Sequence, residues 1–289
     1  RAGIPAGVFN VIVGDDARGM GKVLTEHPDI AKFTFTGSTP VGKALISQCA
    51  STVKKVSMEL GGNAPFIVFA DADLDAAVKG ALVSKYRNAG QTCVCTNRIL
   101  VHQDVMAEFS EKLVAAVSEL SIGNGLTDGV TVGPMISEQA VADVQELVGA
   151  SIEMGAKVVL GGQVDQAGSC FYQPTILTDV TNDMPIAANE IFGPVSPLIS
   201  FASEEEALAL ANDTEYGLAA YFYTRDIGAV WRVAEGLEFG MVGINEGLIS
   251  NAAAPFGGVK QSGSGREGSK YGLDDFMEIK YLCMGGLDK

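Results

Sequence analysis

The chain has 289 residues, a formal net charge of −15 and a hydrophobic fraction of 47%. This length suits two ordinary domains or one large one, and the apolar fraction is sufficient for a buried core. Because nucleic acid and anionic membrane surfaces would repel such a charge, we expect neither as a partner.

The first part of the sequence alternates between short apolar runs, which predict strands, and stretches with helical periodicity. The predicted strands cover residues 8–13, 32–36, 55–60 and 65–69. The predicted helices cover residues 16–26, 41–50 and 74–85, and Asp73 is placed to cap the last of them.

The same alternation continues toward the end of the chain. Further strands are predicted at residues 99–101, 157–160, 219–223, 241–244 and 276–283, and further helices at 106–120, 138–154, 204–212 and 229–237. Residues 245–274 are rich in Gly, Ser and Asn and predict a long irregular segment, a kind that is often functional. The whole pattern predicts an α/β fold in which helices cover a parallel sheet.

The five cysteines are too few for a secreted disulfide scaffold, so we expect a reducing, cytoplasmic environment. No run of about eighteen apolar residues predicts a membrane span, and no leader pattern predicts secretion. Arg1 stands where an initiator Met would, and a predicted strand follows almost at once, so we expect the chain to be a portion of a longer one.

Two of the cysteines, Cys93 and Cys95, lie together in 88-NAGQTCVCTN-97. A metal site needs three or four ligands, but the chain has only two histidines and no second cysteine pair, so we expect no metal. A disulfide and a packed core cysteine remain alternatives. The small and polar neighbours favour an exposed turn, which is the setting of a nucleophilic thiol at Cys93.

The segment 37-GSTPVGKA-44 fits the phosphate-binding pattern G-x-x-x-x-G-K between a predicted strand and a predicted helix. Ala44 stands where a nucleotide hydrolase has its Mg²⁺-binding Ser or Thr, which disfavours that class. Two interpretations stay open for Gly37, Ser38 and Gly42. They form either a phosphate site at a helix N-terminus or an ordinary strand–helix turn.

Two carboxylates also stand beside glycines. Glu59 in 58-MELGGN-63 ends a predicted strand and is either a general base, with a pKa raised by partial burial, or a surface residue. Glu190 in 190-EIFGP-194 either binds sugar hydroxyls, with Phe192 beside a planar ring, or belongs to a simple turn.

Taken in order, F-T-G-S, E-L-G-G-N, G-Q-x-C, E-I-F-G-P and P-F-G-G-x-K-x-S-G resemble the aldehyde dehydrogenase superfamily over essentially the whole chain. The resemblance implies a partial Rossmann-like domain for NAD or NADP in residues 1–61 and a parallel-sheet catalytic domain in residues 62–255. It implies that residues 256–289 form a returning segment with an oligomerisation strand, so we expect a homodimer or homotetramer.

The resemblance also assigns roles. Cys93 would attack the aldehyde, Glu59 would activate the water that hydrolyses the thioester, and the Cys93 N–H would help to hold the oxyanion. Gly37, Ser38 and Gly42 would follow the cofactor pyrophosphate with Leu60 beside it. Glu190 would bind the nicotinamide ribose, with Phe192 nearby.

Three stretches, 86-YRNAGQTCVC-95, 244-INEGLIS-250 and 265-GREGSKYG-272, are most similar to the succinate-semialdehyde type within this family. This similarity implies a small aldehyde substrate with a distal carboxylate, held by Arg87 and Ser250. It also raises the hypothesis that Cys95 forms a reversible disulfide with Cys93, against the alternative of a free thiol without a role.

The chain departs from the family at its front. The family's preceding segment supplies the first strands of the cofactor domain, the residues that bind the adenosine ribose, an oxyanion-hole Asn and a second substrate-facing Arg. None of them is in this sequence, and Asn63 is not assigned to replace the missing Asn. The alternative to a working dehydrogenase is therefore a fragment that folds or assembles without turnover.

Overall fold

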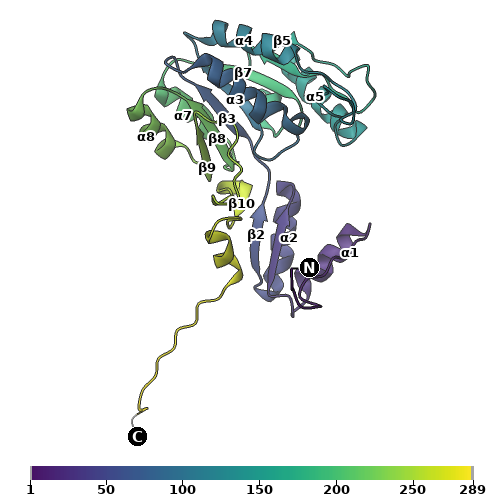
Figure 1. Ribbon diagram of the computed structural model, residues 1–289, viewed down its shortest axis with the longest axis vertical. Coiled ribbons are helices and arrows are strands. Elements are labelled where there is room, and N and C mark those ends of the chain that lie inside the picture. Colours follow the sequence, from purple (N-terminus) through teal and green to yellow (C-terminus); the bar gives the residue numbers. More distant parts are fainter. Residues whose placement is uncertain (1, 288–289) are drawn as a thin grey trace.

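The structure, a computed structural model, describes residues 2–287 and contains two β-sheets joined by residues 60–63 (Figure 1). The order of strands and helices is that of an α/β protein, as the sequence predicts. Within the described residues, no helix is both long enough and apolar enough to cross a membrane.

The smaller sheet has the strand order β1-β2-β10. β1 (Lys32–Thr36) and β2 (Lys55–Glu59) are parallel, and the short β10 (Gly263–Ser264) returns antiparallel to β2 from the far end of the chain. The helices α1 (Ala17–Glu26) and α2 (Thr39–Cys49) contact each other, and α2 packs on both parallel strands. Residues distant in sequence therefore meet at the C-terminal end of β2.

The larger sheet has seven strands, of which only the edge pair β5–β6 is antiparallel. In sheet order they are β5 (Lys157–Leu160), β6 (Thr175–Thr178), β7 (Val195–Phe201), β4 (Thr96–His102), β3 (Ala64–Val68), β8 (Ala219–Tyr223) and β9 (Met241–Ile244). Because parallel strands need crossovers, helices lie on both faces of this sheet.

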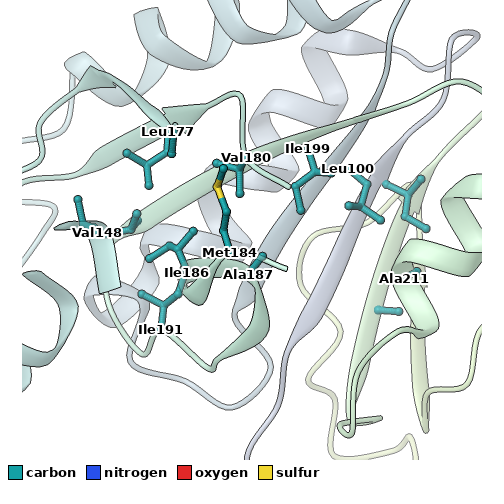
Figure 2. Packing of buried hydrophobic residues seen from close by; sticks show 14 of the residues in the cluster. Leu100, Val148, Leu177, Val180, Met184, Ile186, Ala187, Ile191, Ile199 and Ala211 are labelled. Atoms are coloured by element: carbon teal, nitrogen blue, oxygen red, sulfur yellow. The ribbon is translucent and has the colours of Figure 1, made fainter. Parts of the chain in front are cut away.

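Two hydrophobic clusters show which helices cover each face. In β3, Phe66 packs with α3 (Leu74–Tyr86) and α4 (Met106–Ser118), whereas Ile67 packs on the opposite side. That opposite cluster draws on α5 (Glu138–Glu153), α7 (Glu204–Asn212) and α8 (Ile227–Gly236), and also on the short α6 (Pro185–Ala188). Figure 2 shows side chains of this second cluster, among them Ile186, Ala187 and Ile191.

Local signals in the sequence explain where several helices begin and end. The Asp73 side chain caps α3 by accepting a hydrogen bond from the Ala76 N–H, as predicted. Gly155 follows α5 with a φ of +112°, a conformation that glycine adopts without strain. Four 3₁₀ turns complete the described elements: η1 (Ala50–Thr52), η2 (Arg87–Gly90), η3 (Lys260–Ser262) and η4 (Tyr271–Phe276).

Two predicted strands are wrong for this structure. Residues 8–13 are irregular and solvent-exposed, and residues 276–283 form 3₁₀ turn at Phe276 and then an extended tail that leaves the body of the molecule (Figure 1). An apolar run becomes a strand only when a neighbouring strand accepts its hydrogen bonds, and neither segment has one among residues 2–287. Pairing of the tail with another subunit remains a prediction.

The sequence analysis also missed the strands β6 and β7. Pro197 lies inside β7, opposite Leu177 of β6, although β7 is an interior strand of the sheet. A proline cannot donate a ladder hydrogen bond, so its presence argues against an interior strand. The register between β6 and β7 ends at Pro197, and β7 pairs with β4 from Leu198 onward.

Candidate active site

A pocket of about 510 Å³ lies where the two sheets meet. Its walls come from three places: the smaller sheet with the start of α2, the connection between the sheets, and two loops beside the larger sheet. The lining residues are, in that order, Thr36, Gly37, Ser38 and Glu59; Leu60 and Gly61; and Gln91, Thr92, Cys93, Glu190 and Phe192. Seven of the residues singled out from the sequence therefore surround one cavity: Gly37, Ser38, Glu59, Leu60, Cys93, Glu190 and Phe192.

The loop before Cys93 has a strained backbone. Asn88 and Ala89 have φ values of +52° and +54°, and Gly90 follows at +77°. A Cβ on Gly90 would lie 2.2 Å from the carbonyl oxygen of Gly193, so only glycine permits this approach. The turn thus brings the loop of Cys93 against the loop of Glu190 and Phe192, which comes from a distant part of the sequence.

The thiol of Cys93 is partly buried, and its pKa is raised to about 11. Burial is the largest cause, and the carboxylates of Glu190 and Glu59 add repulsion against a thiolate. The backbone N–H groups of Cys93 and Val94 act in the opposite direction, because they stabilise negative charge on the sulfur. At neutral pH this thiol is therefore protonated.

Glu59 is the last residue of β2 and is only 4% exposed. Burial and then the nearby carboxylate of Glu267 raise its pKa to about 8, while Arg266 lowers it. Its Oε2 has no hydrogen-bond partner within the described residues. A carboxyl group that faces a pocket and has its pKa this close to neutral pH has the properties of a general acid or base.

Glu190 accepts a hydrogen bond of 2.9 Å at Oε1 from the backbone N–H of Gly62. Burial raises the pKa of its carboxyl to about 6, and the Gly62 N–H and the buried Lys85 oppose this rise. Phe192, two residues later, has a φ of +50°, which is unusual for a bulky residue and marks this loop as strained.

The N-terminus of α2 forms the opposite wall. Ser38 is the N-cap residue, but its side chain makes no capping hydrogen bond. Gly37 donates its N–H to the carbonyl of Glu59 at 3.0 Å, which fixes the turn beside β2. Gly42 does not line the pocket, and a Cβ there would lie 2.4 Å from the Leu60 side chain. The glycine lets Leu60 pack closely on the helix.

Besides Gly42, three predicted residues lie outside this pocket. Arg87 and Ser250 are solvent-exposed, and neither is among the lining residues. Cys95 is buried, and its thiol donates to the carbonyl oxygens of Lys85 (3.5 Å) and Thr96 (3.2 Å). All five cysteines are free thiols in this structure.

The sequence analysis missed other residues of the site. Gln91 lines the pocket, and its side chain also holds a neighbouring loop by accepting from the Ile136 N–H at 2.8 Å. Lys85 is fully buried, and its Nζ has no hydrogen-bond partner among residues 2–287. Only its position two residues before Cys93 could have pointed to Gln91 as a pocket residue. The helical periodicity of residues 74–85 did not indicate that Lys85 would be buried.

No group of three or more His, Cys, Asp or Glu side chains is arranged to hold a metal ion in the part of the chain that the structure describes. The pocket instead combines a thiol, two carboxylates of raised pKa and the amide-rich start of a helix. This set suits covalent catalysis by Cys93 followed by general-base catalysis by a carboxylate.

Comparison with known proteins extends these observations. The profile of the aldehyde dehydrogenase family matches residues 1–282. The chain is 62% identical over 289 residues to a 3-sulfolactaldehyde dehydrogenase from Pseudomonas putida and 59% identical over 285 residues to the succinate-semialdehyde dehydrogenase [NADP(+)] GabD from Escherichia coli strain K12. These alignments cover 100% and 99% of this chain but 59% of each relative.

Among solved structures, the crystal structure of succinate-semialdehyde dehydrogenase from Burkholderia pseudomallei superposes with a TM-score of 0.96 at 59% identity. The match covers 98% of this chain and 58% of that one. The chain thus spans roughly three-fifths of the length of the proteins it matches, and its fold is that of their corresponding part.

Proposed function

The chain belongs to the aldehyde dehydrogenase family, and from this premise we propose that it carries the catalytic thiol of an NAD- or NADP-dependent enzyme that oxidises succinic semialdehyde to succinate. One observation carries the proposal: Cys93, Glu59 and Glu190 surround a single pocket although they lie far apart in sequence. The oxidoreductase chemistry needs a nucleophile, a base and a cofactor site in contact, and this pocket contains a candidate for each.

In the proposed reaction, the Cys93 sulfur gives its proton to water and forms a bond with the aldehyde carbon, while the π electrons of the C=O bond move to oxygen and give a thiohemiacetal oxyanion. The Cys93 N–H donates to the developing oxyanion. NAD or NADP, when bound, would supply the acceptor for the hydride of this carbon, and Cys93 would then hold the acyl group as a thioester. Glu59 takes a proton from water, the resulting hydroxide breaks the carbon–sulfur bond, and Cys93 is released with a carboxylate product.

The residues of the pocket fit such a cofactor. Glu190 has one oxygen held by Gly62, and its Oε2 lies close to Gly61 at the cavity, where it could accept from ribose hydroxyls. The N-terminus of α2 favours a phosphate through its N–H groups and dipole. A second pocket of about 610 Å³ lies between α1 and α2, bordered by Pro40 and Val41 just beyond Ser38. We propose that this slot takes the adenosine half.

The proposed substrate has an anionic group at the end opposite its aldehyde. The names of the two relatives above support this class, since sulfolactaldehyde carries a sulfonate and succinic semialdehyde a carboxylate. We propose Arg87 and Ser250 as the residues that hold this group, because Arg87 lies six residues before Cys93 and remains exposed to solvent. The planar guanidinium of Arg87 can bind a carboxylate through two hydrogen bonds.

A second candidate is a chain that folds or assembles without turnover. The exposed apolar side chains of Val11, Ile12 and Val13 near the smaller sheet favour it, because such a surface usually packs against further protein. The residues 276–283 are similarly exposed, which fits the proposed homodimer or homotetramer. A cytoplasmic location stays a prediction.

The test is a spectrophotometric assay of this chain under reducing conditions, with NAD⁺ and NADP⁺ in separate reactions and with succinic semialdehyde or 3-sulfolactaldehyde as substrate. Reduction of either cofactor that Cys93→Ala abolishes supports the dehydrogenase, and comparing the two aldehydes ranks the substrates. If neither cofactor is reduced while Cys93 still hydrolyses an activated ester, the second candidate is correct.

A further inference from the structure

The side chain of Asn97 lies across the backbone on both sides of Glu190. Its Nδ2 donates to the carbonyl oxygen of Asn189 at 2.7 Å, and its Oδ1 accepts from the N–H of Ile191 at 2.9 Å. Asn97 is the second residue of β4 and is 3% exposed. One side-chain amide therefore holds the peptide groups before and after the carboxylate that borders the pocket.

This contact is needed because the loop is held in an unfavourable conformation. Phe192 has a positive φ, and Gly90 presses on the carbonyl of Gly193 from the opposite side. A strained backbone persists only where its surroundings fix it from several directions. Figure 2 shows Ala187 and Ile191 anchored in the hydrophobic cluster, so apolar packing holds one side of the loop and Asn97 holds its polar groups.

A buried network fixes Asn97 in turn. Its Nδ2 also donates to Asn63 Oδ1 at 2.9 Å, and the same oxygen accepts from Arg98 Nε at 2.9 Å. Asn63 Nδ2 donates to the carbonyl of Ala187 at 2.8 Å, at the other end of the loop. Both hydrogens of Asn97 Nδ2 and its oxygen are used, so its orientation is defined.

We propose that Asn97 is a positioning residue that sets where the Glu190 carboxylate lies relative to Cys93 and to the nicotinamide ribose of the proposed cofactor. The effect on a bound cofactor rests on the proposed function, whereas the hydrogen bonds of Asn97 to the Glu190 loop do not depend on it. Cys93 and Asn97 are four residues apart, so the start of β4 couples the nucleophile loop to the Glu190 loop.

The coupling is measurable without any cofactor. The negative charge of Glu190 disfavours the Cys93 thiolate, so Glu190→Gln should increase the rate at which iodoacetamide alkylates Cys93 at pH 8, read by peptide mass spectrometry. Asn97→Ala should release the loop, let the carboxylate leave and increase the same rate by about threefold, equivalent to half a pKa unit. In the Glu190→Gln background, Asn97→Ala should change nothing further.

Asn182→Ala is the matched control, because Asn182 also accepts from Arg98, at 2.9 Å, whereas its side-chain amide donates to Leu210 and Asp213 and, within residues 2–287, not to the Glu190 loop. It should leave Cys93 alkylation unchanged. If Asn97→Ala does not fold, Asn97→Asp serves for hydrogen exchange alone, since it keeps the acceptor for Ile191 and loses the donor to Asn189, whereas its added charge would itself slow alkylation of Cys93. Amide hydrogen exchange in the 189–192 segment should rise in either Asn97 variant.

Equal effects of Asn97→Ala in the wild-type and Glu190→Gln backgrounds would overturn the proposal, because Asn97 would then act independently of the carboxylate. An unchanged alkylation rate in the wild-type background would overturn it as well. Failure of the dehydrogenase assay would count against the proposed function only, since alkylation and exchange require neither turnover nor bound dinucleotide.

Discussion

The backbone N–H of Gly62 donates a 2.9 Å hydrogen bond to the Glu190 carboxylate, which lies 128 residues away in sequence. On its other side, Gly62 is so close to the Cys93 loop that a Cβ would lie 2.3 Å from the Cys93 carbonyl oxygen. The connection between the two sheets is therefore in contact with the Glu190 carboxylate and with the loop of Cys93, the two residues proposed as cofactor-binding group and nucleophile.

We expect Gly62→Ala to lower the free energy of unfolding by about 1–3 kcal/mol, the usual cost of overpacking, because backbone must shift to admit the methyl group. Urea denaturation measures this loss. Gly149→Ala is the control, because Gly149 lies in α5 with nothing within 4 Å of a new Cβ. That variant should gain roughly 0.5–1 kcal/mol from helix propensity. An unchanged free energy of unfolding in Gly62→Ala would contradict the close contact between Gly62 and the Cys93 carbonyl.

The stability of the protein should depend on pH through Glu59. Its pKa rises from 4.5 to about 8 on folding, so the folded state retains a proton that the unfolded state releases. The stabilising contribution is complete below pH 4.5 and is lost as the pH rises through about 8. Relative to Glu59→Gln, wild type should therefore lose unfolding free energy as the pH rises across this range. Exposed Glu153→Gln is the control, and a constant difference would refute the assignment.

Arg87→Ala should raise KM for succinic semialdehyde much more than KM for an uncharged aldehyde of similar length. Loss of a charge-assisted hydrogen bond costs about 1.5–3 kcal/mol, which corresponds to roughly a 10- to 150-fold change. Steady-state kinetics with both aldehydes test this. Arg225→Ala, an exposed arginine paired with Asp73, should alter neither KM. Equal losses on the two aldehydes would remove Arg87 from carboxylate recognition.

If Cys95 resolves an oxidised Cys93, peroxide should inactivate wild type reversibly, and Cys95→Ser should lose the rescue by added thiol. Disulfide formation must first break the contacts of the Cys95 thiol with the carbonyls of Lys85 and Thr96, so we expect it to be slow. Cys93-dependent ester hydrolysis provides the readout. Unchanged inactivation and rescue in Cys95→Ser would leave Cys95 as a free thiol.

Arg98→Lys should be strongly destabilising although it keeps the charge. The guanidinium is fully buried and donates to Asn63, Asn182 and the carbonyls of Asn63, Leu210 and Ala211. An ammonium cannot satisfy this planar arrangement, so we expect a loss of about 3–5 kcal/mol, as when a buried charge loses its partners. Arg232→Lys, at an exposed pair with Glu204, should change stability by about 1 kcal/mol or less.

Much of the fold follows from local sequence. Caps such as Asp73, stops such as Gly155 and the alternation of apolar runs predicted most helices and strands, and the aldehyde dehydrogenase-like α/β fold is confirmed by the solved relatives. The local sequence pattern gave wrong strand predictions where pairing with a neighbouring strand decides the structure. Residues 8–13 have a strand's composition without a partner, and β7 is an interior strand despite Pro197.

For the site, the sequence by itself determined the chemical groups and their family resemblance: a thiol at Cys93, carboxylates at Glu59 and Glu190, and small residues at 37–38. Only the tertiary structure decided that these groups share one pocket, that Gly42 packs on Leu60 instead, and that Asn97 holds the Glu190 loop. The physical reason is that side-chain identity is local, whereas burial and hydrogen-bond partners depend on segments far apart in sequence. Burial raises the pKa of Cys93, Glu59 and Glu190, nearby carboxylates add to the rise at Cys93 and Glu59, and backbone N–H groups oppose it at Cys93 and Glu190. No stretch of residues read alone contains these effects.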